Sequence, residues 1–173
     1  MTTLRAEGGD AFNRAACAWA AKGGGSAAER DNREALGRSR YGYGTKACVI
    51  EDGRERAIGF RIAPGQGNEL THAIPLLDLL PGLPKWVVVD RGYSSYGFRE
   101  HTWTTGARPA IPTTRNEEQL ACPDWVYHSR NIIERLWARL KEWRAVPTRY
   151  EKTAVSFAGV LCLAAKLDWL KSA

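Results

Sequence analysis

Two short runs near the middle of the chain have the apolar pattern of β-strands. They are TKACVIEDG, which begins at Thr45, and RAIGFRIAPGQ, which begins at Arg56. Between them lies Asp52-Gly53, a dipeptide that favours the tight turn of a hairpin. KWVVVD is a continuous apolar run, typical of a strand buried on both faces, and RPAIP predicts one more strand.

Apolar residues recur at helical spacing in four further segments. The first is NELTHAIPLLDLLPG, which stops at Pro81-Gly82 and contains Pro75, so a kink or break is expected there. The others are predicted at residues 95–105, 130–144 and 153–170, whereas residues 113–126 are predicted to form a loop. Strands that alternate with helices predict an α/β fold in which helices flank a mixed sheet.

Residues 1–40 differ from the rest of the chain. They are rich in Ala, Gly, Arg and Ser and show no sustained apolar period. We therefore expect residues 1–40 to be a poorly ordered or degenerate N-terminal segment and residues 41–173 to form one folded domain.

Charge and composition narrow the class of protein. The net charge of +6 suits a polyanionic partner such as nucleic acid, although many proteins without such a partner share it. The four cysteines are scattered, which argues against a zinc site or a disulfide framework and favours reduced thiols. The longest apolar stretch, residues 154–165, is too short to span a bilayer, and residues 1–10 lack the apolar core of a signal peptide. A cytoplasmic protein is expected.

Asp90 is the first candidate for chemistry. It directly follows the apolar run at residues 86–89, and open α/β sheets bind ligands at the carboxyl ends of their strands. A carboxylate in that position is accessible to a divalent cation. The same residue could instead cap the turn that follows the strand, which is a common role of Asp.

A more specific pattern lies in YHSRNIIERLWARLK. Tyr127, Arg130, Glu134 and Lys141 form the spacing Y-x2-R-x3-E-x6-K. On a helix that advances about 100° per residue, the last three share a polar stripe. An exposed face with an ion pair between Arg130 and Glu134 would explain part of that stripe. The separate apolar stripe is predicted to contain Ile132, Ile133, Leu136, Leu140 and Trp143.

This spacing resembles the signature of a large branch of bacterial insertion-sequence transposases of the DDE type. The segments GRSRYGYGTKACVI, RAIGFRIAPGQ, WVVVDRGYSS, ARPAIPTTRN and ERLWARLKEWRAVPTRYEKT resemble consecutive blocks of that family, in family order. The resemblance extends from Lys22 to the C-terminus.

The resemblance implies a ribonuclease H-like mixed sheet flanked by helices. It also implies three carboxylates that hold two divalent ions, Mg²⁺ or Mn²⁺, with Asp90 as the second carboxylate and Glu134 as the third. Tyr127, Arg130 and Lys141 would contact DNA. The implied reaction is DNA strand cleavage and strand transfer at transposon ends.

The implied partners are the transposon inverted repeats, the target DNA and further copies of the same chain on DNA, at the nucleoid. The basic segment GRSRYGYGTK would lie against DNA or lead into the hairpin, and Trp137 is the tryptophan that could face DNA. Arg135, Arg139 and Glu142 are expected on the solvated side of their helix.

The chain departs from the family pattern before the AKGG block at residues 21–24. The first carboxylate is expected near Gly8, and Asp10 lies close to that position but displaced. The gene could be a truncated or frame-shifted copy, Asp10 could serve after a local shift, or a second polypeptide could supply the carboxylate. An active transposase, a catalytically inactive remnant that only binds DNA, and another ribonuclease H-like nuclease such as a resolvase therefore remain open.

Overall fold

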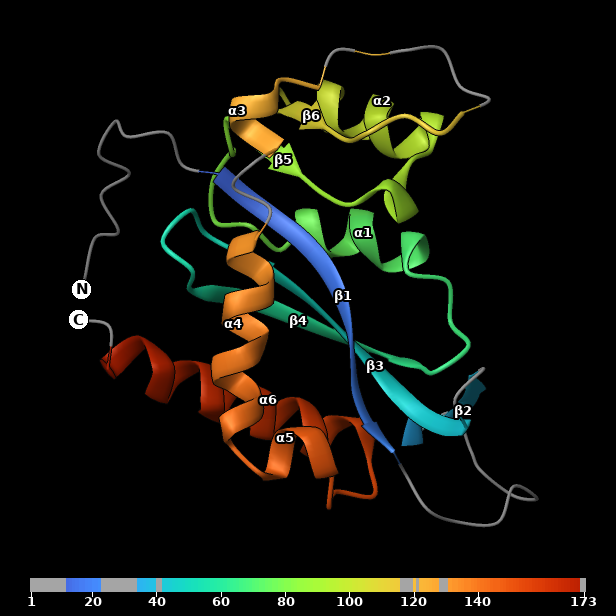
Figure 1. The fold of residues 1–173 in the computed structure, drawn as a ribbon, viewed down its shortest axis with the longest axis vertical. Helices are drawn as coiled ribbons and strands as arrows, with labels where there is room; N and C mark the ends of the chain where they lie inside the picture. Colours follow the sequence, from blue (N-terminus) through green and yellow to red (C-terminus); the bar gives the residue numbers. More distant parts are fainter. Residues whose placement is uncertain are drawn as a thin grey trace.

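The computed structural model describes residues 12–22, 34–39, 42–115, 120, 122–127 and 131–171. They form one mixed sheet with helices on both faces (Figure 1). Neighbouring strands follow the order β2-β3-β1-β5-β6, and β4 also pairs with β3. The strands are β1 (Phe12–Lys22), β2 (Gly37–Ser39), β3 (Gly42–Glu51), β4 (Ala57–Pro64), β5 (Trp86–Val88) and β6 (Arg108–Ala110).

The sheet joins an antiparallel half to a parallel half. β3 pairs antiparallel with β1, β2 and β4. β5 pairs parallel with β1 on one edge and with β6 on the other. The predicted α/β class, a mixed sheet flanked by helices, is therefore confirmed.

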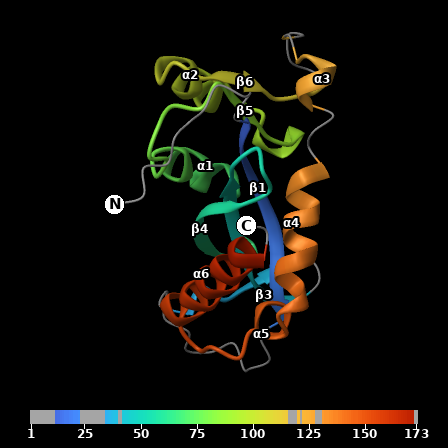
Figure 2. The same cartoon turned by 90° about the vertical axis from the view of Figure 1, so that its left-hand side faces the viewer.

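The helices cover both faces of this sheet, and Figure 2 shows α4 and α1 on opposite sides of β1. No helix within the described ranges is both long and apolar enough to cross a membrane. The helices are α1 (Leu70–Leu77), α2 (Tyr96–Thr104), α3 (Asp124–Tyr127), α4 (Asn131–Glu142), α5 (Ala145–Thr148), α6 (Ala154–Lys171) and the 3₁₀ helix η2 (Arg91–Tyr93).

The predicted hairpin is confirmed by β3 and β4. Asp52 shapes its turn, because its Oδ1 accepts hydrogen bonds from the backbone N–H groups of Arg54 at 2.9 Å and Arg56 at 3.0 Å. Glu55 takes the left-handed conformation, with φ 64°. The turn thereby brings the Glu55 carboxylate to the start of β4.

Two other predictions need adjustment. The helix expected to extend to Pro81-Gly82 ends at Leu77 and is not broken at Pro75. Pro75 removes only one backbone donor, so a short helix tolerates it near its end. The segment predicted as a loop at residues 113–126 contains the beginning of α3, which the sequence did not predict because one helical turn has no detectable period.

The largest correction concerns β1. Residues 12–22 form a strand of the central sheet, so the expectation of a loop-dominated segment up to residue 40 is wrong for this part of it. β1 pairs with β3 on one edge and with β5 on the other. Ladder hydrogen bonds on both edges stabilise a strand even where its own β-propensity is low. The folded unit therefore begins before residue 41.

The prediction of reduced thiols is wrong for Cys48, which is disulfide-bonded. Cys48 is fully buried in β3, and the register of the sheet places Cys17 of β1 directly opposite it. Cys122 and Cys162 are free. Sequence spacing could not reveal this bond, because it depends on which strands pair.

Apolar side chains form a separate cluster on each face of the sheet. Cys48, Ile50, Val87 and Val89 pack with residues of α1 and α2. Ala47 and Val49 alternate with them along β3 and pack with α4 and α6, through Ile133, Leu136, Trp137, Leu140, Phe157 and Leu161. Alternate residues of a strand therefore separate the α1 side from the α4 side.

An ion-pair network fastens α4 to the hairpin and to α6. Arg139 of α4 pairs with Glu55 at 2.6 Å and with Asp168 at 3.0 Å. Arg135, one turn earlier, also pairs with Glu55, at 2.5 Å. Arg139 was expected on the solvated side of α4, but the helix turns this residue toward two carboxylates. The network fixes α4 relative to both neighbours.

Arg139→Leu should lower the free energy of unfolding by about 3 kcal/mol, because the buried Asp168 carboxylate would lose its guanidinium partner. Arg135→Leu is the matched control. Its side chain is 56% exposed, so we expect a loss of only about 0.5 kcal/mol. Urea denaturation at neutral pH measures both values, and equal losses would contradict this account.

The Glu55 part of the network has a predictable dependence on pH. Hydrogen bonds and charge from Arg135 and Arg139 hold the Glu55 pKa below its ordinary value of 4.5. A carboxyl with a lowered pKa stabilises the folded state above the ordinary value, and this stability is lost as the pH falls through the folded-state pKa. The stability difference between the wild type and Glu55→Gln should therefore shrink below pH 4.5. A constant difference down to lower pH would rule this out.

Candidate active site at the end of strand β5

Asp90 lies just beyond β5, where Val89 leads into η2. The residue is exposed. Its Oδ1 accepts a hydrogen bond from the backbone N–H of Arg91 at 2.7 Å and thereby caps η2. The capping role that the sequence left open is therefore observed. The cap holds the carboxylate at the sheet edge without removing it from solvent, so it is compatible with a second role.

The alternation of β5 determines the face on which Asp90 lies. Val87 and Val89 belong to the cluster on the α1 side. Val88 packs instead with Val126 of α3. Asp90 is two residues beyond Val88, so it lies on the same side as α3.

α4 lies on this same side of the sheet. Arg14 of β1 is paired with Glu51 of β3 on one edge and with Val88 of β5 on the other. Paired residues on adjacent strands point to the same face. Glu51 continues the alternation of Ala47 and Val49, which pack against α4. Asp90 and the helix that carries Glu134 therefore share one face.

Tyr127 is the predicted residue that the structure brings to Asp90. It lies on α3, and its hydroxyl donates to Asp90 Oδ1 over 3.5 Å. α3 is held in place by Val126, which is fully buried. The predicted pair of a carboxylate and a tyrosine is thus close in space although 37 residues separate them in sequence.

Glu134 and Lys141 are both exposed on α4. They lie seven residues apart, which corresponds to about 10 Å along a helix. Arg130 is outside the described residues. Ile133, Leu136 and Leu140 are buried, as their spacing predicted.

The prediction that Trp137 could face DNA is wrong. This side chain is only 4% exposed, and its ring meets Phe60 edge-on with 6.4 Å between centroids. Trp137 is buried together with its neighbours Leu136 and Leu140. The apolar stripe of α4 therefore includes Trp137 and is wider than predicted.

Arg99 supports the site and was missed by the sequence analysis. It is buried on α2. Its guanidinium donates to Ser94 Oγ at 2.9 Å and to the backbone carbonyl of Ile111 at 3.0 Å. These bonds tie the segment after Asp90 to the end of β6. The sequence signal that could have revealed this role is the position of Arg99. It follows Phe98, on the face of α2 that faces the sheet.

Divalent-metal ligation is only partly accounted for by the described residues. Asp90 and Glu134 have the oxygen ligands that Mg²⁺ prefers. Within the described ranges, however, no group of three His, Cys, Asp or Glu side chains is placed to hold a metal ion. Asp10, the weak candidate for the first carboxylate, lies outside those ranges.

The register of β1 shows which residues of this strand lie near Asp90. Phe12 is paired with Trp86, and Arg14 with Val88. If this register is continued by two residues, Ala16 of β1 lies beside Asp90. The β1 residues at this level are Arg14, Ala15 and Ala16, and none is a carboxylate.

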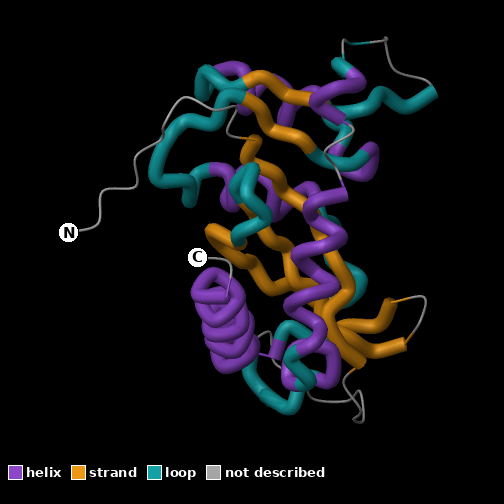
Figure 3. Tube along the Cα trace, turned by 60° about the vertical axis from the view of Figure 1, so that its left-hand side comes forward, coloured by secondary structure: helices purple, strands orange, loops and turns teal. Residues whose placement is uncertain are grey.

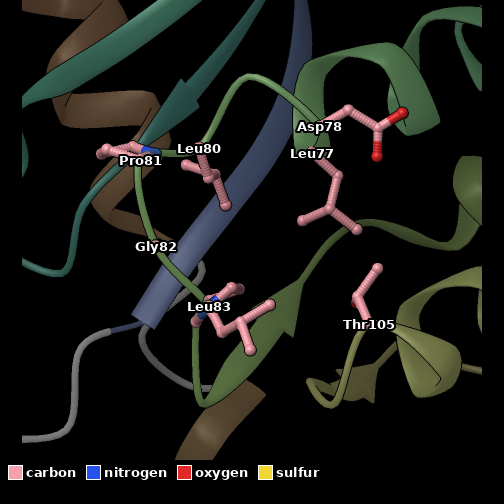
Figure 4. A pocket seen from close by; sticks show the side chains of 8 residues that line it. Leu77, Asp78, Leu80, Pro81, Gly82, Leu83 and Thr105 are labelled. Atoms are coloured by element: carbon pink, nitrogen blue, oxygen red, sulfur yellow. The ribbon is translucent and has the colours of Figure 1, made fainter.

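A pocket of about 240 Å³ lies elsewhere, between the end of α1, the loop before β5 and Thr105 (Figure 4). Leu77, Leu80 and Leu83 line it. Because this loop precedes β5 and Asp90 follows it, the pocket is at the opposite end of the strand. It contains none of the predicted site residues.

Comparisons with known proteins show which family of proteins the chain resembles. Residues 87–171 match the family model of the transposase DDE domain, a range that includes Asp90, Tyr127, Glu134 and Lys141. A protein of Brucella ovis assigned as a transposase for insertion sequence element IS6501 is 27% identical over 129 residues, which cover 73% of this chain and 98% of the relative. The family match and the relative together support a DDE-type insertion-sequence transposase.

The capping role of Asp90 can be tested separately from catalysis. Asp90→Ala should lower the free energy of unfolding by about 1 kcal/mol, because η2 loses its cap. Asp90→Asn should change it by about 0.3 kcal/mol or less, because the amide oxygen accepts the same hydrogen bond. Urea denaturation of both variants measures this, and an equal loss in the two would show that the carboxylate charge, not the cap, stabilises the fold.

Proposed function

We propose that this transposase cleaves DNA strands at the ends of its insertion sequence and joins them to target DNA, with Asp90 and Glu134 as two of its metal-binding carboxylates. The observation that carries the proposal is the position of Asp90, exposed at the end of β5 on the face covered by α3 and α4. We also propose that the fold is ribonuclease H-like, which the mixed strand order and the family match support.

Mg²⁺ or Mn²⁺, bound as a pair, would activate the attacking oxygen and stabilise the leaving one at the phosphorus. Asp90 is suited to this ligation because the bond from Arg91 fixes its Oδ1 while the side chain stays exposed. Tyr127, which donates to the same oxygen, would orient the carboxylate or contact the DNA backbone.

DNA would approach this face along the exposed side of α4. Lys141 and Arg130 would neutralise phosphates, Lys141 as a point charge and Arg130 as a planar bidentate donor. The net charge of +6 favours such an encounter. We propose the inverted repeats and the target DNA as ligands, and a homo-oligomer on DNA, at the nucleoid in the cytoplasm, as the working form.

Asp90→Asn and Glu134→Gln should each abolish nicking of transposon-end DNA in Mg²⁺ or Mn²⁺, because an amide is a far weaker ligand than a carboxylate. Binding of the same DNA should persist in both variants. The assay is nicking of a labelled duplex that carries the inverted repeat, with binding followed by fluorescence anisotropy.

Glu142→Gln is the matched control, because Glu142 is an exposed glutamate at the end of the same helix. It should nick as the wild type does. Wild-type activity in Glu134→Gln, or an equal loss in Glu142→Gln, would remove Glu134 from the site.

Lys141→Ala should weaken binding to transposon-end DNA and reduce the slope of log affinity against log salt by about 1, because one phosphate contact is lost. Lys152→Ala, an exposed lysine before α6, serves as the control and should leave the slope unchanged. Anisotropy titrations over a series of salt concentrations measure both slopes. An unchanged slope in Lys141→Ala would count against the DNA contact.

The register of β1 favours a second candidate, DNA binding without cleavage. The β1 residues level with Asp90 are basic or neutral. A site with too few carboxylates binds divalent ions weakly, whereas the cationic residues of α4 would still attract DNA. Binding of the inverted repeat by the wild type, with no nicking in either metal, would select this candidate.

A further inference from the structure

Trp125 is a large aromatic side chain that lies in solvent beside the candidate site. It is on α3, two residues before Tyr127, whose hydroxyl donates to Asp90. The residue is 58% exposed, whereas the next residue, Val126, is fully buried. In Figure 3, α3 lies at the same end of the sheet as β5 and β6, beyond the first turn of α4. α3 therefore buries Val126 for the fold and leaves the indole of Trp125 accessible.

Trp86 supports the ring of Trp125. The two rings meet edge-on, with 5.8 Å between centroids and an interplanar angle of 82°. Trp86 is itself buried, and it packs with Val88 and Val126 on the α3 side of the sheet. Because an edge-on contact covers at most one face of a ring, at least one face of Trp125 is not covered by Trp86. A supported indole of this kind is a platform on which a planar group can stack.

Trp86 also holds a cation beside this platform. The guanidinium of Arg108 lies over the Trp86 ring, 5.6 Å from its centroid. Arg108 is exposed at the start of β6, and its backbone N–H donates to the carbonyl of Lys85 at 3.0 Å, so a second exposed cation adjoins it. Asp124, which is also exposed, precedes Trp125 at the start of α3. Because a carboxylate repels anions, an anionic group is expected on the Arg108 side of the platform.

We call Trp86, Arg108 and Trp125 the indole patch. It lies on the same face of the sheet as Asp90, because Trp86 precedes Asp90 by four residues and Arg108 is paired with Trp86. Four residues of a strand span about 13 Å. Successive base pairs of DNA lie about 3.4 Å apart, so DNA with its scissile phosphate at Asp90 would reach the patch within about four nucleotides.

The chemistry of the indole patch indicates which state of DNA it binds. A base inside a duplex is covered by its neighbours on both faces, so it offers no face to an indole. An unpaired base does offer a face, and stacking on an aromatic ring tolerates every base. Arg108 can neutralise a phosphate of the same strand. An aromatic platform beside a cation is the combination that binds single-stranded nucleic acid.

We propose that Trp125 stacks on an unpaired base of the DNA strand held at Asp90, and that Arg108 contacts a phosphate of that strand. The inference rests on the proposed function, because that function places DNA at the Asp90 face. It adds that the bound strand is unpaired within about four nucleotides of the scissile phosphate. Paired DNA would be bound through α4, as proposed above, without a contribution from the indole patch.

The test compares two duplexes that carry the inverted repeat, one with blunt ends and one with a short single-stranded overhang at the end of the repeat. Fluorescence anisotropy measures binding to the full chain in EDTA, so that no cleavage occurs. The wild type should bind the overhang duplex more tightly. Trp125→Ala should lose about tenfold in affinity for the overhang duplex and bind the blunt duplex as before. Trp125→Phe should retain most of the preference, because it keeps an aromatic ring.

Trp103→Ala is the matched control. Trp103 is equally exposed, at 58%, but it lies on α2, which packs on the opposite face of the sheet. This variant should bind both duplexes as the wild type does. Equal affinity of the wild type for the two duplexes, or an unchanged preference in Trp125→Ala, would overturn the proposal. The same loss in Trp103→Ala, or a loss in Trp125→Ala that is equal for both duplexes, would overturn it too.

A fluorescent aminopurine base in the overhang gives an independent readout of stacking. Its emission falls when the base stacks on an indole, so binding of the wild type should quench it and binding of Trp125→Ala should not. Equal quenching by the two proteins would contradict the stacking role. Arg108→Ala should reduce the slope of log affinity against log salt by about 1 on the overhang duplex, and an unchanged slope would contradict the phosphate contact.

These measurements need no metal, so they separate the indole patch from cleavage. A wild type that prefers the overhang but does not nick DNA in Mg²⁺ or Mn²⁺ would contradict the proposed cleavage and support the patch. A wild type that nicks the inverted repeat without preferring the overhang would contradict the patch alone.

Discussion

The pairing of β1 with both β3 and β5 is the constraint on which the candidate site depends. β1 is the strand that joins the antiparallel hairpin to the parallel half of the sheet. Its register fixes which residues of β3 and β5 share a face, and therefore that Asp90 lies on the side of α4. A slip of one residue would exchange the two faces of the strand. The same register brings Arg14, not a carboxylate, beside the end of β5.

α4 is held over this face by two kinds of interaction. Its apolar stripe packs on β3 and α6, and Arg139 joins it to Glu55 and Asp168. Hydrophobic packing sets the distance of the helix from the sheet but is not directional. Ion pairs with fixed carboxylates restrict its rotation and translation. Glu134 and Lys141 are exposed on this helix, as their proposed roles toward metal and DNA require.

The candidate site thus combines a well-supported scaffold with Asp90 and Glu134, the two proposed metal-binding carboxylates. Asp90, Tyr127 and the helix of Glu134 are brought to one face, whereas no group of three acidic, histidine or cysteine side chains that could hold a metal ion is found within the described residues. In a transposase, DNA binding and DNA cleavage usually occur together, but they depend on different features of the protein. Attraction of DNA depends on the number of exposed cations, but cleavage depends on a closed ligand set around the metal. DNA binding can therefore persist without DNA cleavage.

The sequence by itself determined the local elements and the candidates for chemistry. Alternation predicted β3 and β4, the run of valines predicted β5, and the period of α4 predicted its buried residues, because these patterns reflect local burial. The spacing from Tyr127 to Lys141 marked the family.

Only the tertiary structure decided what depends on long-range pairing. It made residues 12–22 a central strand, joined Cys48 in a disulfide, buried Trp137 and turned Arg139 toward Glu55. It also brought Tyr127 to Asp90. The physical reason is the same in each case: these contacts join residues far apart in the chain, and a local period carries no information about which distant segment will pack against it.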